Sequence, residues 1–282
     1  HDLRSIRHDR WQFTLDVFQD YLTFCQAPFS VTFEREDQVM DKAVALFVRE
    51  ETIAVDGAGQ GAAAKCEAIY TIQAEKRLSM DYYKNMIVHY FLPVAFVGLS
   101  ALTTSDNDIT FATLSDDFAF LKKLFRHEFV FDDERSDADE IRENLAYLQA
   151  RGYVDYEEGT MPVSVRLING GRDVLKVFAG LLQTHLESYW LVTRSISMIE
   201  RRGQEEKDWL REIRRLGLKF YKDGEIRRYE SLSHLNFRGA LRFLTEADLI
   251  SPMEKETRRI YQACGTPEML DEIRRRISRH LF

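Results

Sequence analysis

One apolar stretch, residues 81–102, constrains the fold of this chain more than any other segment. Its apolar part runs from Met86 to Leu102 and contains His89 and Pro93. A membrane-spanning helix needs roughly 20 mostly apolar residues, and proline disrupts a helix and restricts the residue before it. The stretch therefore predicts a buried helix, or two short helices that meet at Pro93, rather than a membrane span. A contact with the membrane interface stays open.

The composition predicts a soluble globular protein. Hydrophobic residues make up 45% of the 282 residues and charged residues 30%. The net charge of −7 argues against nucleic acid as the main partner, because such proteins usually carry a basic face. An acidic run at 132–140 and basic runs at 258–259 and 274–279 predict solvated helix faces.

The cysteines indicate the redox compartment of the protein, and the N-terminus indicates whether the sequence is part of a longer chain. Cys25, Cys66 and Cys264 fit no metal-site spacing, and their odd number argues against a disulfide framework. We therefore expect a reducing compartment. The sequence opens on His1 without a signal-peptide pattern, so we expect a piece of a longer protein.

The first part of the chain predicts two helices and a hairpin. Apolar spacing predicts helices over 15–25 and 35–49, and the segments 52–55 and 68–72 predict paired strands. The glycine-rich turn 56–61 between them lacks the Gly-Lys-Ser/Thr of a phosphate loop. It is interpreted as a hairpin tip.

The middle of the chain has the outline of a winged-helix unit. Helices are predicted over 114–126 and 138–150, followed by a hairpin of 153–156 with 163–167. Ser115 is predicted to cap the first helix, and Ser136 or Asp137 the second, because their side-chain oxygens can accept from free first-turn amides. Gly152 fits the left-handed position after a helix.

The remainder is predicted to be helical over 173–202, 205–221, 233–246 and 267–281, with Pro267 in a first turn. A weak recurrence is also present. Three helices with paired apolar positions are each followed by a β-prone position, at Ile53, Tyr153 and Leu249. The pattern suggests related packing units of a helix plus a wing.

Taken together, the sequence predicts a mainly α fold with small β-hairpins (α+β), a helical scaffold that contains winged-helix-like units. The expected divisions are N-terminal helices plus a β-hairpin at 1–75, a central helix and winged-helix-like unit at 76–169, and a C-terminal helical unit at 170–282. One continuous domain is the alternative.

No catalytic constellation stands out. His127 and Asp132 form the one His-x4-Asp pair, a spacing used for a general base and its orienting acid, but they end a helix and enter an acidic loop. His89 is interpreted as a satisfied core histidine or a helix-packing residue, and His185 as a core packing residue. No serine lies in a Gly-x-Ser-x-Gly context. We therefore predict no catalytic residues, no metal site and no cofactor.

A DNA-binding function is disfavoured by the second helix of the winged-helix-like unit. In a DNA reader this helix presents basic or amide side chains to a groove. Here its first turn, from Asp137 to Glu140, is acidic and would repel phosphates.

A family resemblance rests on the order of several motifs. Residues 80–93 contain a Tyr-Tyr-x-Asn-x3-His pattern that runs into Leu-Pro. The order continues through 121–131, through Ile-x3-Leu-x5-Arg-Gly-Tyr-Val at 141–154, through Tyr-Trp at 189–190, and through Arg-Phe-Leu-x4-Leu-Ile at 242–250. From about Met40 onward, the chain resembles the C-terminal region of bacterial membrane-associated glycerol-3-phosphate 1-O-acyltransferases.

The resemblance implies a parent enzyme that transfers an acyl group from acyl-acyl carrier protein or acyl-CoA to glycerol 3-phosphate, in phospholipid biosynthesis at the cytoplasmic side of the inner membrane. The family's catalytic His-x4-Asp block lies upstream and is absent here. We therefore expect an inactive scaffold or regulatory region that is itself soluble, packs against the upstream acyltransferase domain, and leaves peripheral membrane contact open. Tyr82, Tyr83, Asn85 and His89 are the predicted interdomain contacts. The alternative is a winged-helix-like adaptor or regulator that binds protein.

Overall fold

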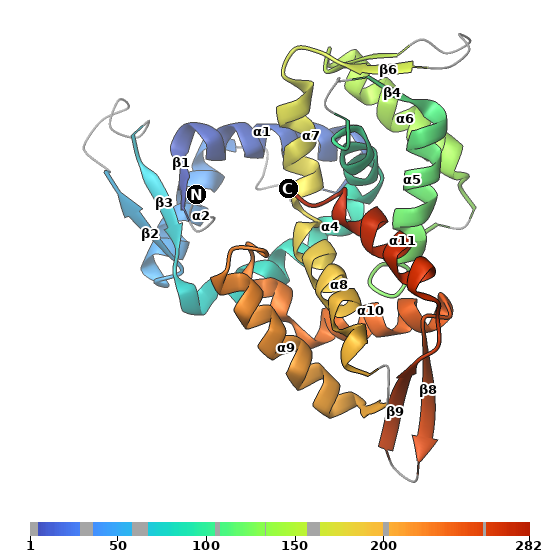
Figure 1. The fold of residues 1–282 in the computed structure, drawn as a ribbon. Coiled ribbons are helices and arrows are strands. Elements are labelled where there is room, and N and C mark those ends of the chain that lie inside the picture. Colours follow the sequence, from blue (N-terminus) through green and yellow to red (C-terminus); the bar gives the residue numbers. More distant parts are fainter. Residues whose placement is uncertain are drawn as a thin grey trace. The chain divides into compact units, whose positions relative to one another are not determined.

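A computed structural model describes residues 5–28, 36–57, 67–104, 108–132, 134–156, 164–199, 203–255 and 258–282 (Figure 1). The chain forms two compact units, His1–Tyr90 and Phe91–Phe282. The boundary falls inside helix α4 (Arg77–Ala101). Helices dominate, and the strands form small three-stranded antiparallel sheets. The predicted fold class, mainly α with small β-hairpins, is therefore confirmed.

Within its described residues, the first unit contains a helix pair, a three-stranded sheet and the start of α4. Its elements are β1 (Ser5–Arg7), α1 (His8–Phe24), α2 (Glu36–Arg49), β2 (Ile53–Asp56) and β3 (Ile69–Ile72). The strand order is β1-β3-β2, with Ile53 opposite Ile72 in the predicted hairpin. The hairpin strands are confirmed, whereas the tip from residue 58 onward, and Cys66, lie outside the described residues.

The same succession of elements occurs twice more, in the second unit. One copy consists of β4 (Asp108–Thr110), α5 (Phe111–Leu124), α6 (Asp137–Ala150), β5 (Val154–Tyr156) and β6 (Ser164–Leu167). The other consists of β7 (Gln204–Glu205), α9 (Glu206–Lys222), α10 (His234–Glu246), β8 (Ile250–Lys255) and β9 (Arg258–Ala263).

In all three copies the first strand pairs with the third strand, which gives the orders β1-β3-β2, β4-β6-β5 and β7-β9-β8. The weak recurrence in the sequence therefore corresponds to a repeated strand-helix-helix-hairpin motif. The last hairpin was not predicted in full. Arg258 and Arg259 lie on strand β9, so their interpretation as a helix face is wrong.

Local side-chain chemistry sets the helix ends of the middle copy. Ser136 accepts from the amide of Asp139 at 3.1 Å, and Gly152 has a φ of 71°, as predicted. The predicted cap at Ser115 is wrong, because α5 begins at Phe111 and Thr110 caps it, accepting from the amide of Thr113 at 3.2 Å. An apolar pattern marks only the part of a helix that packs, and this helix begins one turn before that part.

Helix α4 is a single helix of 25 residues with Pro93 in its interior, so the alternative of two short helices is wrong. Apart from half-buried Pro93, the side chains from Phe91 to Ala101 are buried. Burial of so many apolar groups offsets the hydrogen bond that proline cannot make. None of the described helices is long and apolar enough to cross a membrane.

The long helix predicted over 173–202 is two helices, α7 (Gly171–Gly180) and α8 (Gln183–Ser195), followed by a 3-10 turn at Ile196–Met198. Gly180 ends α7, and glycine is a weak helix former. The apolar pattern continues across the break because both helices are buried, which is why periodicity did not reveal it.

Helix α8 lies at the centre of the second unit and packs on α9, α10 and α11 (Pro267–Ser278) (Figure 1). Its buried Glu187 accepts hydrogen bonds from the backbone amides of Arg227 and Arg228, at 3.1 and 3.0 Å, and from the Ser231 hydroxyl at 2.6 Å. The Arg228 guanidinium adds an ion pair at 2.9 Å. These bonds compensate the buried charge and hold the segment between α9 and α10.

Close packing at the start of α7 gives a stability prediction. A Cβ on Gly171 would collide with the backbone carbonyl oxygen of Tyr153, whereas a Cβ on Gly180 meets nothing within 4 Å. We expect Gly171→Ala to lower the free energy of unfolding by about 1–3 kcal/mol through overpacking. The control, Gly180→Ala, should be neutral or stabilise by up to about 1 kcal/mol. Urea denaturation of both variants checks this, and equal effects would contradict the packing at Gly171.

Candidate functional site

The four predicted contact residues lie in the N-terminal half of α4. Tyr82 and Tyr83 are 66% and 58% exposed. Asn85 is half-buried and donates to the Asp81 carboxylate at 3.3 Å. His89 is exposed and lies against the ring of Tyr90, with 4.1 Å between centroids. The interpretation of His89 as a core residue is therefore wrong, because the helix turns this position to solvent.

The two tyrosines belong to a larger exposed apolar surface. We define the α4 strip as the five exposed apolar side chains of this half of the helix: Leu78, Tyr82, Tyr83, Met86 and Ile87. Positions 78, 82 and 86 follow one another at four-residue spacing, and 83 and 87 run beside them, so the side chains share one side of the helix. Clusters of large exposed apolar side chains usually mark an interaction surface.

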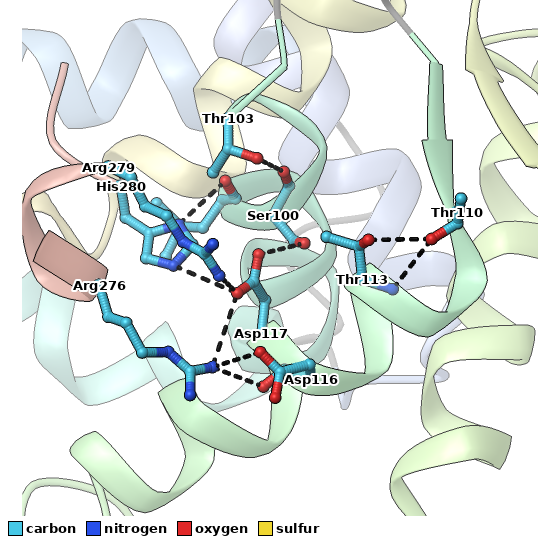
Figure 2. A network of polar contacts seen from close by, with 10 residues as sticks. Ser100, Thr103, Thr110, Thr113, Asp116, Asp117, Arg276, Arg279 and His280 are labelled. Carbon is cyan, nitrogen blue, oxygen red and sulfur yellow. Dashed lines mark hydrogen bonds and ion pairs between the residues drawn. The ribbon is translucent and has the colours of Figure 1, made fainter. Parts of the chain in front are cut away.

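Apart from the apolar α4 strip, a cluster of polar residues joins α4, α5 and the end of the chain (Figure 2). The fully buried carboxylate of Asp117 accepts from the Ser100 hydroxyl at 2.8 Å. It forms ion pairs with Arg279 and, at 3.8 Å, with Arg276, while Nε2 of His280 lies 3.9 Å from it. Arg276 and Arg279 were expected on a solvated face, but these ion pairs correct that expectation.

This cluster contains serine, aspartate and histidine, yet its geometry differs from that of a catalytic triad. A nucleophilic serine donates to the imidazole, and the carboxylate orients the far side of the ring. Here Ser100 donates to the carboxylate itself, and His280 Nδ1 lies 3.2 Å from the Leu99 carbonyl, which accepts. Burial, reinforced by the charges of Arg279 and Arg276, lowers the pKa of His280 to about 4. The arrangement therefore fixes the C-terminal helix rather than activating a hydroxyl.

Glu128 is a half-buried acid that the sequence did not reveal. Tyr189 donates to its Oε1 at 3.0 Å, and a Cβ on Gly239 would collide with the same oxygen. Burial raises the pKa of Glu128 to about 7, although the Tyr189 hydrogen bond and the Arg242 charge lower it. A carboxyl with this pKa could exchange protons near neutrality, but its neighbours here are a core tyrosine and a helix backbone.

The His-x4-Asp pair is not assembled. His127 Nε2 lies 3.0 Å from Glu246 Oε1, on α10. The Asp132 carboxylate instead accepts from the amide of Glu134 at 2.9 Å. The described part of the chain also contains no group of three or more metal-ligating side chains. Cys25 and Cys264 are free thiols.

Comparison with known proteins identifies the family. Residues 3–253 match the family described as the glycerol-3-phosphate acyltransferase C-terminal region, and the chain belongs to this family. Among its curated relatives are proteins named "Putative acyltransferase plsB1" from Mycobacterium tuberculosis (strain ATCC 25618 / H37Rv) and Mycobacterium bovis (strain ATCC BAA-935 / AF2122/97).

Each relative is 25% identical to this chain over 190 residues, which cover 65% of the chain and 30% of the relative. The chain thus spans about 30% of the length of the curated relatives that it matches.

The Asp117 cluster gives a stability prediction. We expect Asp117→Asn to lower the free energy of unfolding by about 3 kcal/mol, because Arg279 and Arg276 lose their buried counter-charge. The control, Asp116→Asn, removes a carboxylate that is 68% exposed and also pairs with Arg276, and should cost less than about 1 kcal/mol. Urea denaturation midpoints measure both, and similar losses would show that burial of Asp117 contributes little.

Glu128 gives a pH prediction. Its pKa in the folded state, about 7, lies above the ordinary value of 4.5, so its stabilising contribution is complete below about pH 4.5 and is lost as the pH rises through 7. Glu128→Gln cannot ionise. The free energy of unfolding of this variant minus that of the parent should therefore be about 2 kcal/mol larger at pH 8 than at pH 5. Chemical denaturation at both pH values tests this, with exposed Glu272→Gln as the control. A difference between Glu128→Gln and the parent that does not change with pH would contradict the raised pKa.

Proposed function

We propose that this chain is the non-catalytic C-terminal scaffold of a glycerol-3-phosphate acyltransferase, and that it packs against the upstream acyltransferase domain through the α4 strip. The observation that carries the proposal is the exposure of five large apolar side chains on a helix whose other half is buried. Apart from Leu78, the residues of the strip also belong to the segment 80–93, which most resembles the family.

An upstream domain is chosen as the partner of the α4 strip because of the family of the chain and the greater length of its relatives. The relatives extend well beyond the matched region, so a longer protein offers a partner surface. The strip combines aromatic rings with flexible methionine and leucine side chains, a composition typical of the buried centre of protein interfaces. Leaving such a surface in water would forgo about 25 cal/mol for each Å² of apolar area that docking could bury.

The parent reaction in this proposal is acyl transfer from acyl-acyl carrier protein or acyl-CoA to the sn-1 hydroxyl of glycerol 3-phosphate, in phospholipid biosynthesis at the cytoplasmic side of the inner membrane. The chain alone is inactive in this account. The separate partners of His127 and Asp132, and the inward-facing Ser100, support that expectation. The divisions at 75/76 and 169/170, and the peripheral membrane contact, remain parts of the proposal.

A second candidate is a winged-helix-like adaptor that binds a separate protein. The repeated strand-helix-helix-hairpin motif favours it, because first-strand to third-strand pairing around two helices is the arrangement of a winged-helix unit. The two candidates differ in the partner: the scaffold binds the upstream domain of its own protein, whereas the adaptor binds another chain.

Substitution in the α4 strip tests the scaffold role. In the full-length enzyme, the double variant Tyr82→Ser/Met86→Ser should lower acyl-transfer activity by about tenfold or more, because loss of two central apolar contacts weakens docking by at least about 1.4 kcal/mol. The control, Val130→Ser, changes an exposed apolar residue in the α5–α6 segment and should leave activity unchanged.

Folding must be measured beside activity. The isolated chain carrying Tyr82→Ser/Met86→Ser should unfold at the same urea concentration as the parent, since both side chains are exposed. Full activity in the double variant would refute docking through the strip. Acyl transfer by the isolated chain would refute the non-catalytic role.

A further inference from the structure

A basic cavity lies in the third copy of the repeated motif, within the second unit. Its volume is about 500 Å³, and its walls come from β7, the first turns of α9, the first turns of α10, and strand β9. Lys207 and Arg211 come from α9, Arg238 from α10, and Arg258 and Arg259 from β9. Five cationic side chains from distant parts of the sequence thus line one cavity. We call it the α9–α10 cavity.

The charges of the cavity are only partly compensated. Glu205 and Glu206 are the two carboxylates of its lining, and they pair with Arg258 at 3.6 Å and with Arg238 at 3.1 Å. Arg211 pairs with Asp208, outside the lining. The lining therefore carries three more positive than negative side chains, on a chain whose net charge is −7. Such a local excess attracts anions.

His234, the first residue of α10, provides an independent observation. Its side chain is half-buried and lines the cavity, and its Nε2 has no hydrogen-bond partner within the described residues. Buried polar atoms are normally hydrogen-bonded, so this nitrogen lacks the partner that such an atom usually has. Burial, together with the charges of Arg214 and Arg238, lowers the pKa of His234, which favours the neutral ring.

The start of α10 adds a third element. Its N-cap residue, Ser233, makes no side-chain hydrogen bond to the first-turn amides. The positive end of the helix dipole therefore remains available to an anion at the wall that the first turns of α10, with His234 and Arg238, form. Guanidinium groups offer paired donors that match the oxygens of a phosphate.

We propose that the α9–α10 cavity binds a phosphate group, held by Arg238 and Arg259 and hydrogen-bonded by His234. The phosphate comes either from a soluble phosphate ester or from an anionic lipid headgroup, since both present the same oxygens. A nucleic-acid duplex fits less well, because Glu205 and Glu206 stand among the cations and the chain as a whole is acidic. The site shares no residue with the α4 strip and does not depend on docking through it.

The test is a binding experiment on this chain. Isothermal titration with inorganic phosphate forms one arm. Co-sedimentation with phosphatidylcholine vesicles, with and without phosphatidate, forms the other. Arg238→Gln and Arg259→Gln should each weaken binding by about tenfold, the effect of removing one charged hydrogen-bond donor. The control, Arg275→Gln, removes an exposed arginine from α11, outside the cavity, and should bind like the parent. The imidazole NMR signals of His234 should shift on binding.

The outcomes separate the sources. Phosphate binding with no preference for phosphatidate vesicles identifies a soluble ester, and selective binding of phosphatidate vesicles identifies a headgroup. In both cases the effect must be lost in the cavity variants and kept in the control. Absence of binding in both arms overturns the proposal, as does an equal loss in Arg275→Gln. Tighter, salt-sensitive binding of duplex DNA through the same arginines would also overturn it and assign a nucleic-acid surface instead.

Discussion

The buried carboxylate of Asp117 is the interaction on which the second unit depends. A carboxylate without solvent must be paired and hydrogen-bonded, or it loses its charge. Here the partners come from α4, through Ser100, and from the end of the chain, through Arg276 and Arg279. Segments at the beginning and end of the unit thus both bind to one side chain of α5. The central helix α8, with its satisfied Glu187, fills the space beside them.

The two halves of α4 then have different roles. The half from Phe91 onward is apolar, buried and anchored at Ser100, so it belongs to the core. The half from Arg77 to Tyr90 is also rich in apolar side chains, but it presents them to solvent as the α4 strip. A helix with an unused apolar side suggests a missing partner, and the family of the chain, with its longer relatives, suggests which one. The apolar strip and the α9–α10 cavity offer different chemistry, and neither needs the other.

Much of the fold could be predicted from local patterns. Apolar spacing located most helices, and Ser136 and Gly152 marked helix ends because each acts on its immediate neighbours. Local patterns could not show the break at Gly180 or the continuity of α4 through Pro93, since tertiary burial decides both. The recurrence at Ile53, Tyr153 and Leu249 pointed to related units, but strand order depends on pairing between distant segments.

For the candidate sites, too, the sequence revealed some residues, and only the structure showed how the others come together. Tyr82 and Tyr83 were found through a family resemblance, and only the structure shows that they are exposed and continue into Met86 and Ile87. The Asp117 cluster could not be predicted, because its carboxylate and Arg279 are joined by the fold and by no spacing in the sequence. The basic cavity was missed for the same reason: Arg238 and Arg259 come from different elements.

The central claim is that the α4 strip is covered in the whole protein. Cysteine labelling measures this directly, with Tyr82→Cys introduced after the native cysteines of each protein are replaced by serine. The account predicts that a maleimide reacts rapidly with this position in the isolated chain and much more slowly in the full-length protein, while a Val130→Cys control reacts equally fast in both. Equal labelling rates at position 82 in the two proteins would contradict the account.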